Sequence, residues 1–207
     1  NTLEDSVYAF TKYVVEALKQ QGTTPDMIQI GNEINHGILR PDGNVKNLDQ
    51  LADLLRAGSQ AVIDVDPRIQ LMLHVALGGQ NEESVWFIDN MIARKVPFDL
   101  IGQSYYPKWH GTLDDLQNNL NDLVRRYNKD IIIVEYSHEK NAVNKIGFEL
   151  PNGKGKGTCI WEPLNTWEKI FDELPDRHRR PAALLVSDVT RLRQLVLDLL
   201  ELGRLDS

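Results

Sequence analysis

Apolar residues along the chain follow two alternating spacings. Intervals of three and four residues, typical of one helix face, predict a first helix with Leu3, Val7, Phe10, Val14 and Leu18 on its apolar side. Short apolar runs, typical of buried strands, separate this helix from the later ones. The full pattern predicts helices within residues 2–22, 47–66, 85–92, 112–127 and 142–150, and strands at 27–30, 70–75, 98–102, 131–134 and 158–161.

The predicted strands are apolar throughout and alternate with the helices, which implies a parallel sheet covered by helices. A doubly wound open sheet and a (β/α)8 barrel both fit this alternation. No glycine motif typical of a phosphate-binding loop follows a strand. The glycine-rich run 152–157 is predicted to be a turn or loop that precedes a strand, so we expect no phosphate site there.

Length and charge narrow the possible functions. The 207 residues suffice for one domain with a core, but a complete barrel typically needs ~250. The net charge of −7 argues against nucleic acid or an anionic membrane as the main partner. The sequence predicts neither a membrane span nor a signal peptide. A single cysteine, Cys159, excludes an internal disulfide.

Candidate functional residues follow the predicted strands, where parallel α/β sheets place their sites. Asn32 and Glu33 come after the first strand, and Glu135 ends the fourth. Aromatic and histidine side chains follow or end the others: His74, Tyr105, Tyr106, Trp109, His110 and Trp161. This set suits glycoside hydrolysis, in which one carboxylic acid protonates the leaving oxygen and a second carboxylate attacks or activates water.

Several of these residues also have a purely structural interpretation. Glu135 follows a buried strand, so its charge must be paired or functional. His74 fits a hydrogen-bonded core histidine as well as a substrate contact, and the two tyrosines can be divided between core and site. The remaining histidines, His36, His138 and His178, show no metal-ligand spacing, so no zinc site is expected.

Four blocks of the sequence, within residues 24–35, 73–79, 101–111 and 155–163, resemble glycoside hydrolase family 53. They read TPDMIQIGNEIN, LH followed by GG, IGQSYYPKWHG, and GKG followed by WEP. This family of endo-β-1,4-galactanases belongs to the clan A retaining glycosidases. The resemblance covers about residues 3–172. It implies a (β/α)8 TIM barrel, incomplete here, with about strands 4 to 8 present and strands 1 to 3 missing.

The resemblance also implies an activity, which is endo-acting cleavage of β-1,4-galactan in type I arabinogalactan, a pectin side chain, with retention. By position, Glu33 matches the acid/base and Glu135 the nucleophile. The positions expected to line the substrate cleft are Asn32, His74, Tyr105, Trp109, His110 and Trp161. Some family members carry a structural calcium, but no acidic cluster between residues 153 and 172 demands one. We therefore expect no cofactor or metal, a polysaccharide partner, and a secreted, periplasmic or cell-surface parent protein.

The sequence alone determines neither the origin of its last 35 residues nor a single function. Residues 1–172 are predicted to be a partial catalytic barrel, and residues 173–207 a helical segment with apolar spacing at Leu185, Val189, Leu192, Val196 and Leu199. That segment fits a replacement eighth helix, an altered reading frame or a packing helix for a partner. Alternative functions are another clan A β-glycanase, acting on mannan or xylan, and an inactive or glycan-binding barrel fragment.

Overall fold

The computed structural model describes residues 2–162, and residues up to Trp161 form one compact unit. The boundary predicted at 172 and the helix predicted after it lie outside the described residues. The helices are α1 (Leu3–Gln20), α2 (Leu48–Val65), α3 (Asn81–Ala93), α4 (Pro107–His110), α5 (Leu113–Tyr127) and α6 (Lys140–Phe148), with 3-10 turns η1 (Ile34–His36) and η2 (Pro151–Gly153). The strands are β1 (Met27–Gln29), β2 (Gln70–Val75), β3 (Leu100–Tyr105), β4 (Asp130–Tyr136) and β5 (Gly155–Ile160).

Two of the helices, α1 and α5, begin with a capping box. In α1 the Thr2 side chain accepts a hydrogen bond from the backbone N–H of Asp5, whose carboxylate accepts one from the backbone N–H of Thr2. Thr112 and Asp115 repeat this capping box at the start of α5. These reciprocal bonds satisfy backbone donors that a helix start otherwise leaves without partners, so the helix boundaries follow from local sequence.

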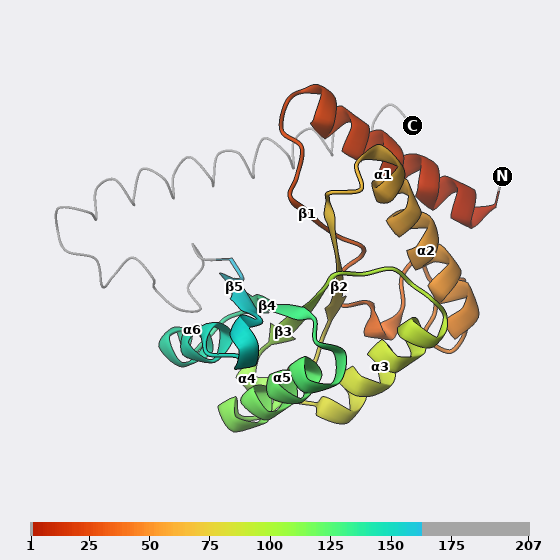
Figure 1. Ribbon diagram of the computed structural model, residues 1–207. Coiled ribbons are helices and arrows are strands. Elements are labelled where there is room, and N and C mark those ends of the chain that lie inside the picture. Colours follow the sequence, from red (N-terminus) through yellow and green to blue (C-terminus); the bar gives the residue numbers. More distant parts are fainter. Residues whose placement is uncertain (1, 163–207) are drawn as a thin grey trace, which may run out of the picture. The chain divides into compact units, whose positions relative to one another are not determined.

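The five strands form one parallel sheet in the order β1-β2-β3-β4-β5, and the helices follow one another around its outside (Figure 1). In a doubly wound sheet the strand order reverses at a switch point, whereas in a barrel each strand lies beside the next one in sequence. The sequential strand order therefore identifies the sheet as part of a (β/α)8 barrel and excludes the doubly wound alternative, as predicted. No helix among residues 2–162 is long and apolar enough to cross a membrane.

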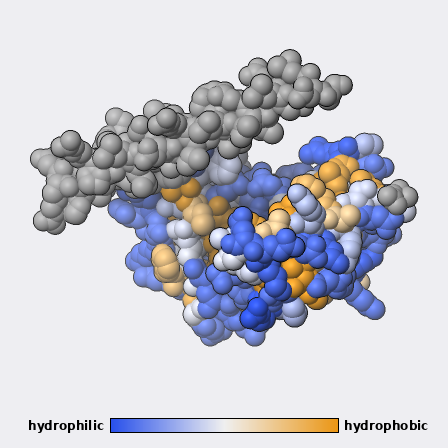
Figure 2. Space-filling view, turned by 90° about the horizontal axis from the view of Figure 1, so that it is seen from above, coloured by the Kyte–Doolittle hydropathy of each residue, from blue (hydrophilic) through white to orange (hydrophobic). Residues whose placement is uncertain are grey.

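The two faces of the sheet differ in their neighbours. Leu73, Ile101 and Ile133 belong to the core between strands and helices. The alternate positions His74, Gly102 and Ser104 point to the inner side of the barrel, because side chains alternate between faces. Hydrophobic residues also reach the surface in patches (Figure 2). The rings of Phe10 and Tyr13 of α1 are both exposed. Helix α1 precedes β1 in the chain, and β1 is an edge strand of the sheet within the described residues.

A register shift in β4 decides where Glu135 points. Gln103 pairs with Ile133, but Ser104 pairs with Glu135, so Val134 has no partner of its own in β3. Without this bulge Ser104 would pair with Val134, and Glu135 would point to the helices. The extra residue turns the carboxylate to the inner face, a use of bulges that is common next to active sites.

The glycine-rich segment before the last strand differs from the prediction. Residues Gly155 to Gly157 were expected in a loop, yet β5 starts at Gly155. A Cβ atom at Gly155 would collide with the carbonyl oxygen of Gly147 in α6. Glycine is needed here for this close approach of strand and helix, and not for a turn.

Candidate active site

Glu33 lies in a tight turn directly after β1. Its backbone is left-handed, with φ 47° and ψ 51°, and Gly31 before it also has a positive φ of 78°. A residue other than glycine adopts this conformation rarely and at a cost that the surroundings must offset. Part of the compensation comes from His74, because the backbone N–H of Glu33 donates to its Nδ1 atom (3.3 Å).

His74 of β2 connects this turn with β3. The side chain is 0% exposed, and its Nε2 atom lies 2.6 Å from Oγ of Ser104. The neutral ring carries one proton: it is on Nε2 when Nδ1 accepts from Glu33, and on Nδ1 when Nδ1 donates to Asn32. The Nε2 atom accordingly donates to the Ser104 hydroxyl or accepts from it. The amide oxygen of Asn32 lies 3.1 Å from Nδ1. In this structure the ring is buried and both its nitrogens face protein atoms, as in a hydrogen-bonded core histidine, so the substrate contact stays a prediction.

Burial lowers the pKa of His74 to about 4, and the nearby charge of Glu33 offsets part of this effect. The unfolded chain binds a proton at this histidine near pH 6.5, whereas the native protein binds it only near pH 4. The free energy of unfolding should therefore fall as the pH drops from 7 to 4, by ~3 kcal/mol from this group alone. A His74→Gln variant, which keeps a donor for Ser104, should show a correspondingly weaker pH dependence in urea unfolding.

Other titrating groups do not disturb this comparison. Burial also lowers the pKa of His110, and burial raises that of Glu135, but both groups are present in the wild type and in the variant. The difference between the two pH profiles therefore isolates His74. Parallel profiles of the wild type and the variant would show that His74 has the same pKa in the native and the unfolded protein, and would contradict the prediction.

Glu135 is held at the inner end of β4. Its side chain is 8% exposed, and the hydroxyl of Tyr106 donates to Oε2 (3.0 Å). Burial raises the pKa of Glu135, the hydrogen bond from Tyr106 lowers it, and the charge of Glu33 raises it again. The charge of Glu33 therefore acts on the Glu135 carboxylate and disfavours its ionised form.

The two adjacent tyrosines have different roles. Tyr105, predicted to bind substrate, is 1% exposed, belongs to the core, and donates its hydroxyl to the carbonyl of Gly111 (3.1 Å). Tyr106, in extended backbone one position further, points to the opposite side and reaches Glu135. Strand alternation from Ser104, on the inner face, was the sequence signal that could have distinguished them.

The remaining predicted residues surround Tyr106 or the end of β5. His110 is buried and accepts a hydrogen bond at Nδ1 from the backbone N–H of Tyr106 (3.1 Å). Trp109 is 57% exposed and meets the Tyr106 ring edge to face, with the centroids 6.2 Å apart. Trp161 is also exposed, and its backbone N–H donates to the carbonyl of Tyr136 (2.8 Å). The two exposed indoles can contact a ligand, whereas His110 shapes the turn behind them.

A Tyr106→Phe variant should move the acid limb of kcat/KM to higher pH. The hydroxyl stabilises the ionised form of Glu135, so its loss raises the pKa of this carboxyl by ~1 unit. The measurement is the pH dependence of kcat/KM for the glycoside hydrolysis that the sequence predicts. The control is Tyr105→Phe, which loses a hydrogen bond in the core and should lower stability without moving the acid limb. An unmoved limb in Tyr106→Phe would exclude this role.

The comparison with known proteins shows the family of the chain. The sequence profile described as glycosyl hydrolase family 53 matches residues 1–147. The chain belongs to this family. The family 53 chain is 43% identical over 155 residues to "Uncharacterized protein in bgaB 5'region" of Niallia circulans, covering 71% of this chain and 42% of that protein.

Two further relatives carry informative descriptions. The probable arabinogalactan endo-beta-1,4-galactanase A of Neosartorya fischeri is 34% identical over 143 residues, which cover 65% of this chain and 40% of the relative. A structure from a study of two fungal beta-1,4-galactanases superposes with a TM-score of 0.73 at 25% identity, covering 78% of this chain and 59% of that one. The family 53 chain thus spans about two fifths of the length of the curated relatives it matches.

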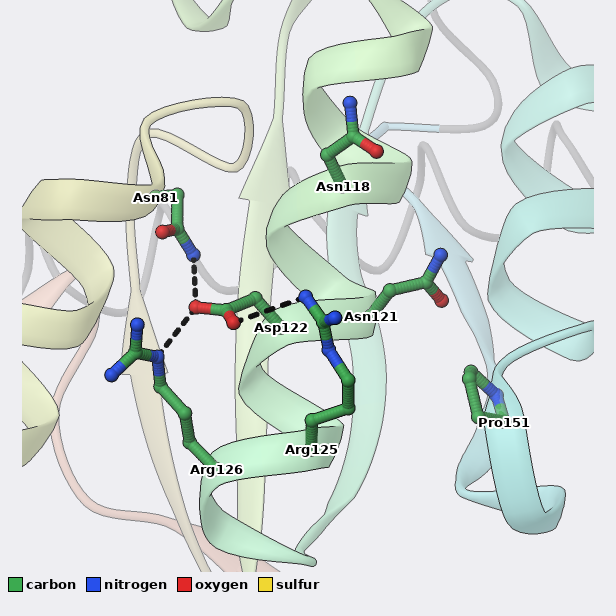
Figure 3. Close-up of a pocket in the computed structure, with 7 residues that line it drawn as sticks. All are labelled: Asn81, Asn118, Asn121, Asp122, Arg125, Arg126 and Pro151. Atoms are coloured by element: carbon green, nitrogen blue, oxygen red, sulfur yellow. Dashed lines mark hydrogen bonds and ion pairs between the residues drawn. The ribbon is translucent and has the colours of Figure 1, made fainter.

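A hollow on the helical side of the family 53 chain does not include the candidate site. It lies between α3 and α5, where Asp122 binds Asn81, Arg125 and Arg126 (Figure 3). None of the eight predicted site residues lines it. Among residues 2–162 no group of three or more histidine, cysteine or carboxylate side chains could hold a metal ion. The expectation of no metal stays a prediction for the whole chain.

Proposed function

We propose that the intact protein is an endo-acting, retaining β-1,4-galactanase with Glu33 as acid/base and Glu135 as nucleophile. The observation that carries this proposal is the pair of electrostatically interacting carboxylates at the carboxyl ends of β1 and β4, one of them buried and hydrogen-bonded by Tyr106. The galactanase descriptions of the relatives support the choice of substrate.

In the proposed double displacement, Glu33 transfers protons and Glu135 forms the covalent bond. Glu33 donates a proton to the glycosidic oxygen while the Glu135 carboxylate attacks the anomeric carbon, so the leaving sugar departs with a new hydroxyl and the other part forms an ester with Glu135. Glu33, now ionised, takes a proton from water, whose oxygen attacks the anomeric carbon and releases Glu135. Two inversions give net retention. This route requires a carboxylate separation of about 5–5.5 Å.

The Tyr106 hydroxyl supports this division, because its hydrogen bond favours the ionised form of Glu135. Burial and the charge of Glu33 act in the opposite direction and raise the pKa of Glu135. A protonated Glu33 carries no negative charge, so in the first step it does not oppose the ionised nucleophile.

Exposed side chains beside the pair supply contacts for the sugar. The indole rings of Trp109 and Trp161 offer flat apolar surfaces to the C–H faces of galactose units. The exposed amide of Asn32, next to Glu33 in sequence, can bind a hydroxyl beside the reacting carbon, where hydrogen bonds strengthen in the transition state. A polymeric substrate is too large for import, which favours a secreted, periplasmic or cell-surface location.

The test is a substrate panel with stereochemical analysis. The intact protein should release reducing ends from β-1,4-galactan much faster than from mannan or xylan. Early in the reaction, proton NMR should show the β-anomer of the products, and medium-length oligosaccharides should precede galactose. A preference for mannan or xylan would exclude the galactanase, and initial α-anomers would exclude the double displacement.

A further inference from the structure

Trp86 on α3 exposes aromatic surface at a place where none of the predicted site residues lies. Its side chain is 43% exposed and lines a surface hollow together with Gln80, Asn81, Glu82 and Glu83. Tryptophan is buried to a high degree in most proteins, and exposed aromatic surface in a hollow often marks a binding site.

This exposure does not arise at an edge of the described sheet. Helix α3 lies between its neighbours: Arg94, just after α3, forms an ion pair with Asp49 of α2 (2.8 Å), and Asn81 donates to Asp122 of α5 (3.1 Å). Strand β2, which precedes α3, pairs on both sides with β1 and β3. The hollow therefore lies on a helix that has a neighbouring helix on each side.

The lining combines the groups that bind a neutral sugar. The indole offers an apolar plane, and two carboxylates accept hydrogen bonds from hydroxyl groups. The amide of Gln80 can donate or accept, whereas Asn81 offers its amide oxygen, because its amide nitrogen donates to Asn119 and Asp122. Glu83 is held in place, since the amide nitrogen of Asn35 donates to its Oε1 (3.3 Å). The carboxylates Glu82 and Glu83 would repel an anionic glycan such as polygalacturonate.

Hydrogen bonds connect the hollow with the proposed cleft. Asn35, which holds Glu83, lies two residues after Glu33, and its side-chain oxygen accepts from the backbone N–H of Ala76 (2.9 Å). On the other side, the amide of Gln80 donates to the carbonyl of Trp109 (3.5 Å). Two residues of the hollow, Gln80 and Glu83, thus contact segments that also carry candidate active-site residues.

We propose that the Trp86 hollow is a second glycan-binding site, which holds a neutral β-linked polysaccharide outside the catalytic cleft. The identity of this glycan as β-1,4-galactan rests on the proposed function, but binding itself needs no catalysis. The site would keep the enzyme on its polymer between cleavage events, because a second contact raises the local concentration of substrate at the cleft.

The experiment is native gel electrophoresis of the 207-residue chain in gels that contain soluble galactan, mannan, xylan or polygalacturonate. Galactan should retard the wild type, and Trp86→Ala should weaken the apparent dissociation constant about tenfold, as expected for the loss of an aromatic anchor. Ile92→Ala is the matched control, because Ile92 is an exposed apolar residue of the same helix outside the hollow. It should migrate like the wild type.

A second variant keeps the test independent of folding in Trp86→Ala. Glu82→Lys changes an exposed side chain of the hollow and should weaken retardation by galactan while allowing retardation by polygalacturonate. Equal galactan retardation of the wild type and both variants would overturn the proposal, as would stronger retardation of the wild type by polygalacturonate. Trp86-dependent retardation by mannan or xylan alone would support the site and contradict the galactanase function.

Discussion

Replacing Glu135 by alanine should lower kcat for galactan on the order of 10⁵-fold, since loss of the nucleophile removes the covalent route. The residue reaches the inner face of the sheet only through the β-bulge at Val134, and Tyr106 then fixes its orientation. No other described carboxylate has this combination of burial and partner. Reducing-end release by the intact protein measures the effect, with Glu149→Ala, an exposed glutamate after α6, as the matched control.

Rescue by a small nucleophile, azide, tests whether Glu135 acts as the nucleophile or only stabilises the structure. In Glu135→Ala the missing side chain leaves room for azide on the face that the carboxylate would occupy. Azide should then attack an activated aryl galactoside and give the α-galactosyl azide, with one inversion. Full activity of Glu135→Ala, or a β-azide product, would contradict the assignment of Glu135 as nucleophile.

Most of the fold could be predicted from spacing alone. The periodic apolar residues of α1, α2 and α5 and the β-branched run Ile131–Val134 predicted elements that the structure confirms, because those patterns reflect burial on one side or on both. The choice between a barrel and a doubly wound sheet depended on strand order, which periodicity does not contain. The resemblance to family 53 supplied that information, and the sequential pairing of β1 to β5 confirms it.

The site was harder to predict, because it depends on local departures from regular structure. The positions after strands identified both glutamates, since a parallel sheet brings the carboxyl ends of its strands to one rim. The single extra residue at Val134 and the left-handed backbone of Glu33 leave no clear mark in the apolar pattern. Such irregularities are where function overrides local preference.

His74 shows how burial can change the role of a residue. From the sequence, a histidine at a strand end fitted either a substrate contact or a core residue. The structure places it beneath the turn of Glu33, where its ring nitrogens lie within hydrogen-bond distance of the Glu33 backbone and of the Ser104 hydroxyl. The contacts of His74 become visible only when three segments are placed in space: the turn that follows β1, strand β2 and strand β3.

Replacing Glu33 by alanine should lower kcat for galactan by ~10²–10⁴, the range typical of general acid–base catalysis. The effect should depend on the leaving group. A sugar alkoxide needs the proton of Glu33, whereas an acidic phenol leaves without it, so the first step with a dinitrophenyl galactoside should stay fast. The second step still lacks its base, and the galactosyl ester on Glu135 should accumulate, visible as a mass increase of one sugar residue.

The stereochemistry of rescue then distinguishes the two carboxylates. Azide needs no general base, so it should release the accumulated ester of Glu33→Ala as the β-galactosyl azide, opposite in configuration to the product expected with Glu135→Ala. Glu149→Ala again serves as the control and should show neither ester nor azide product. If Glu33→Ala loses the same factor with phenol and sugar leaving groups, Glu33 is not the acid. The opposite configurations expected from the two variants follow from the geometry proposed here, in which the carboxylates flank the anomeric carbon from opposite faces.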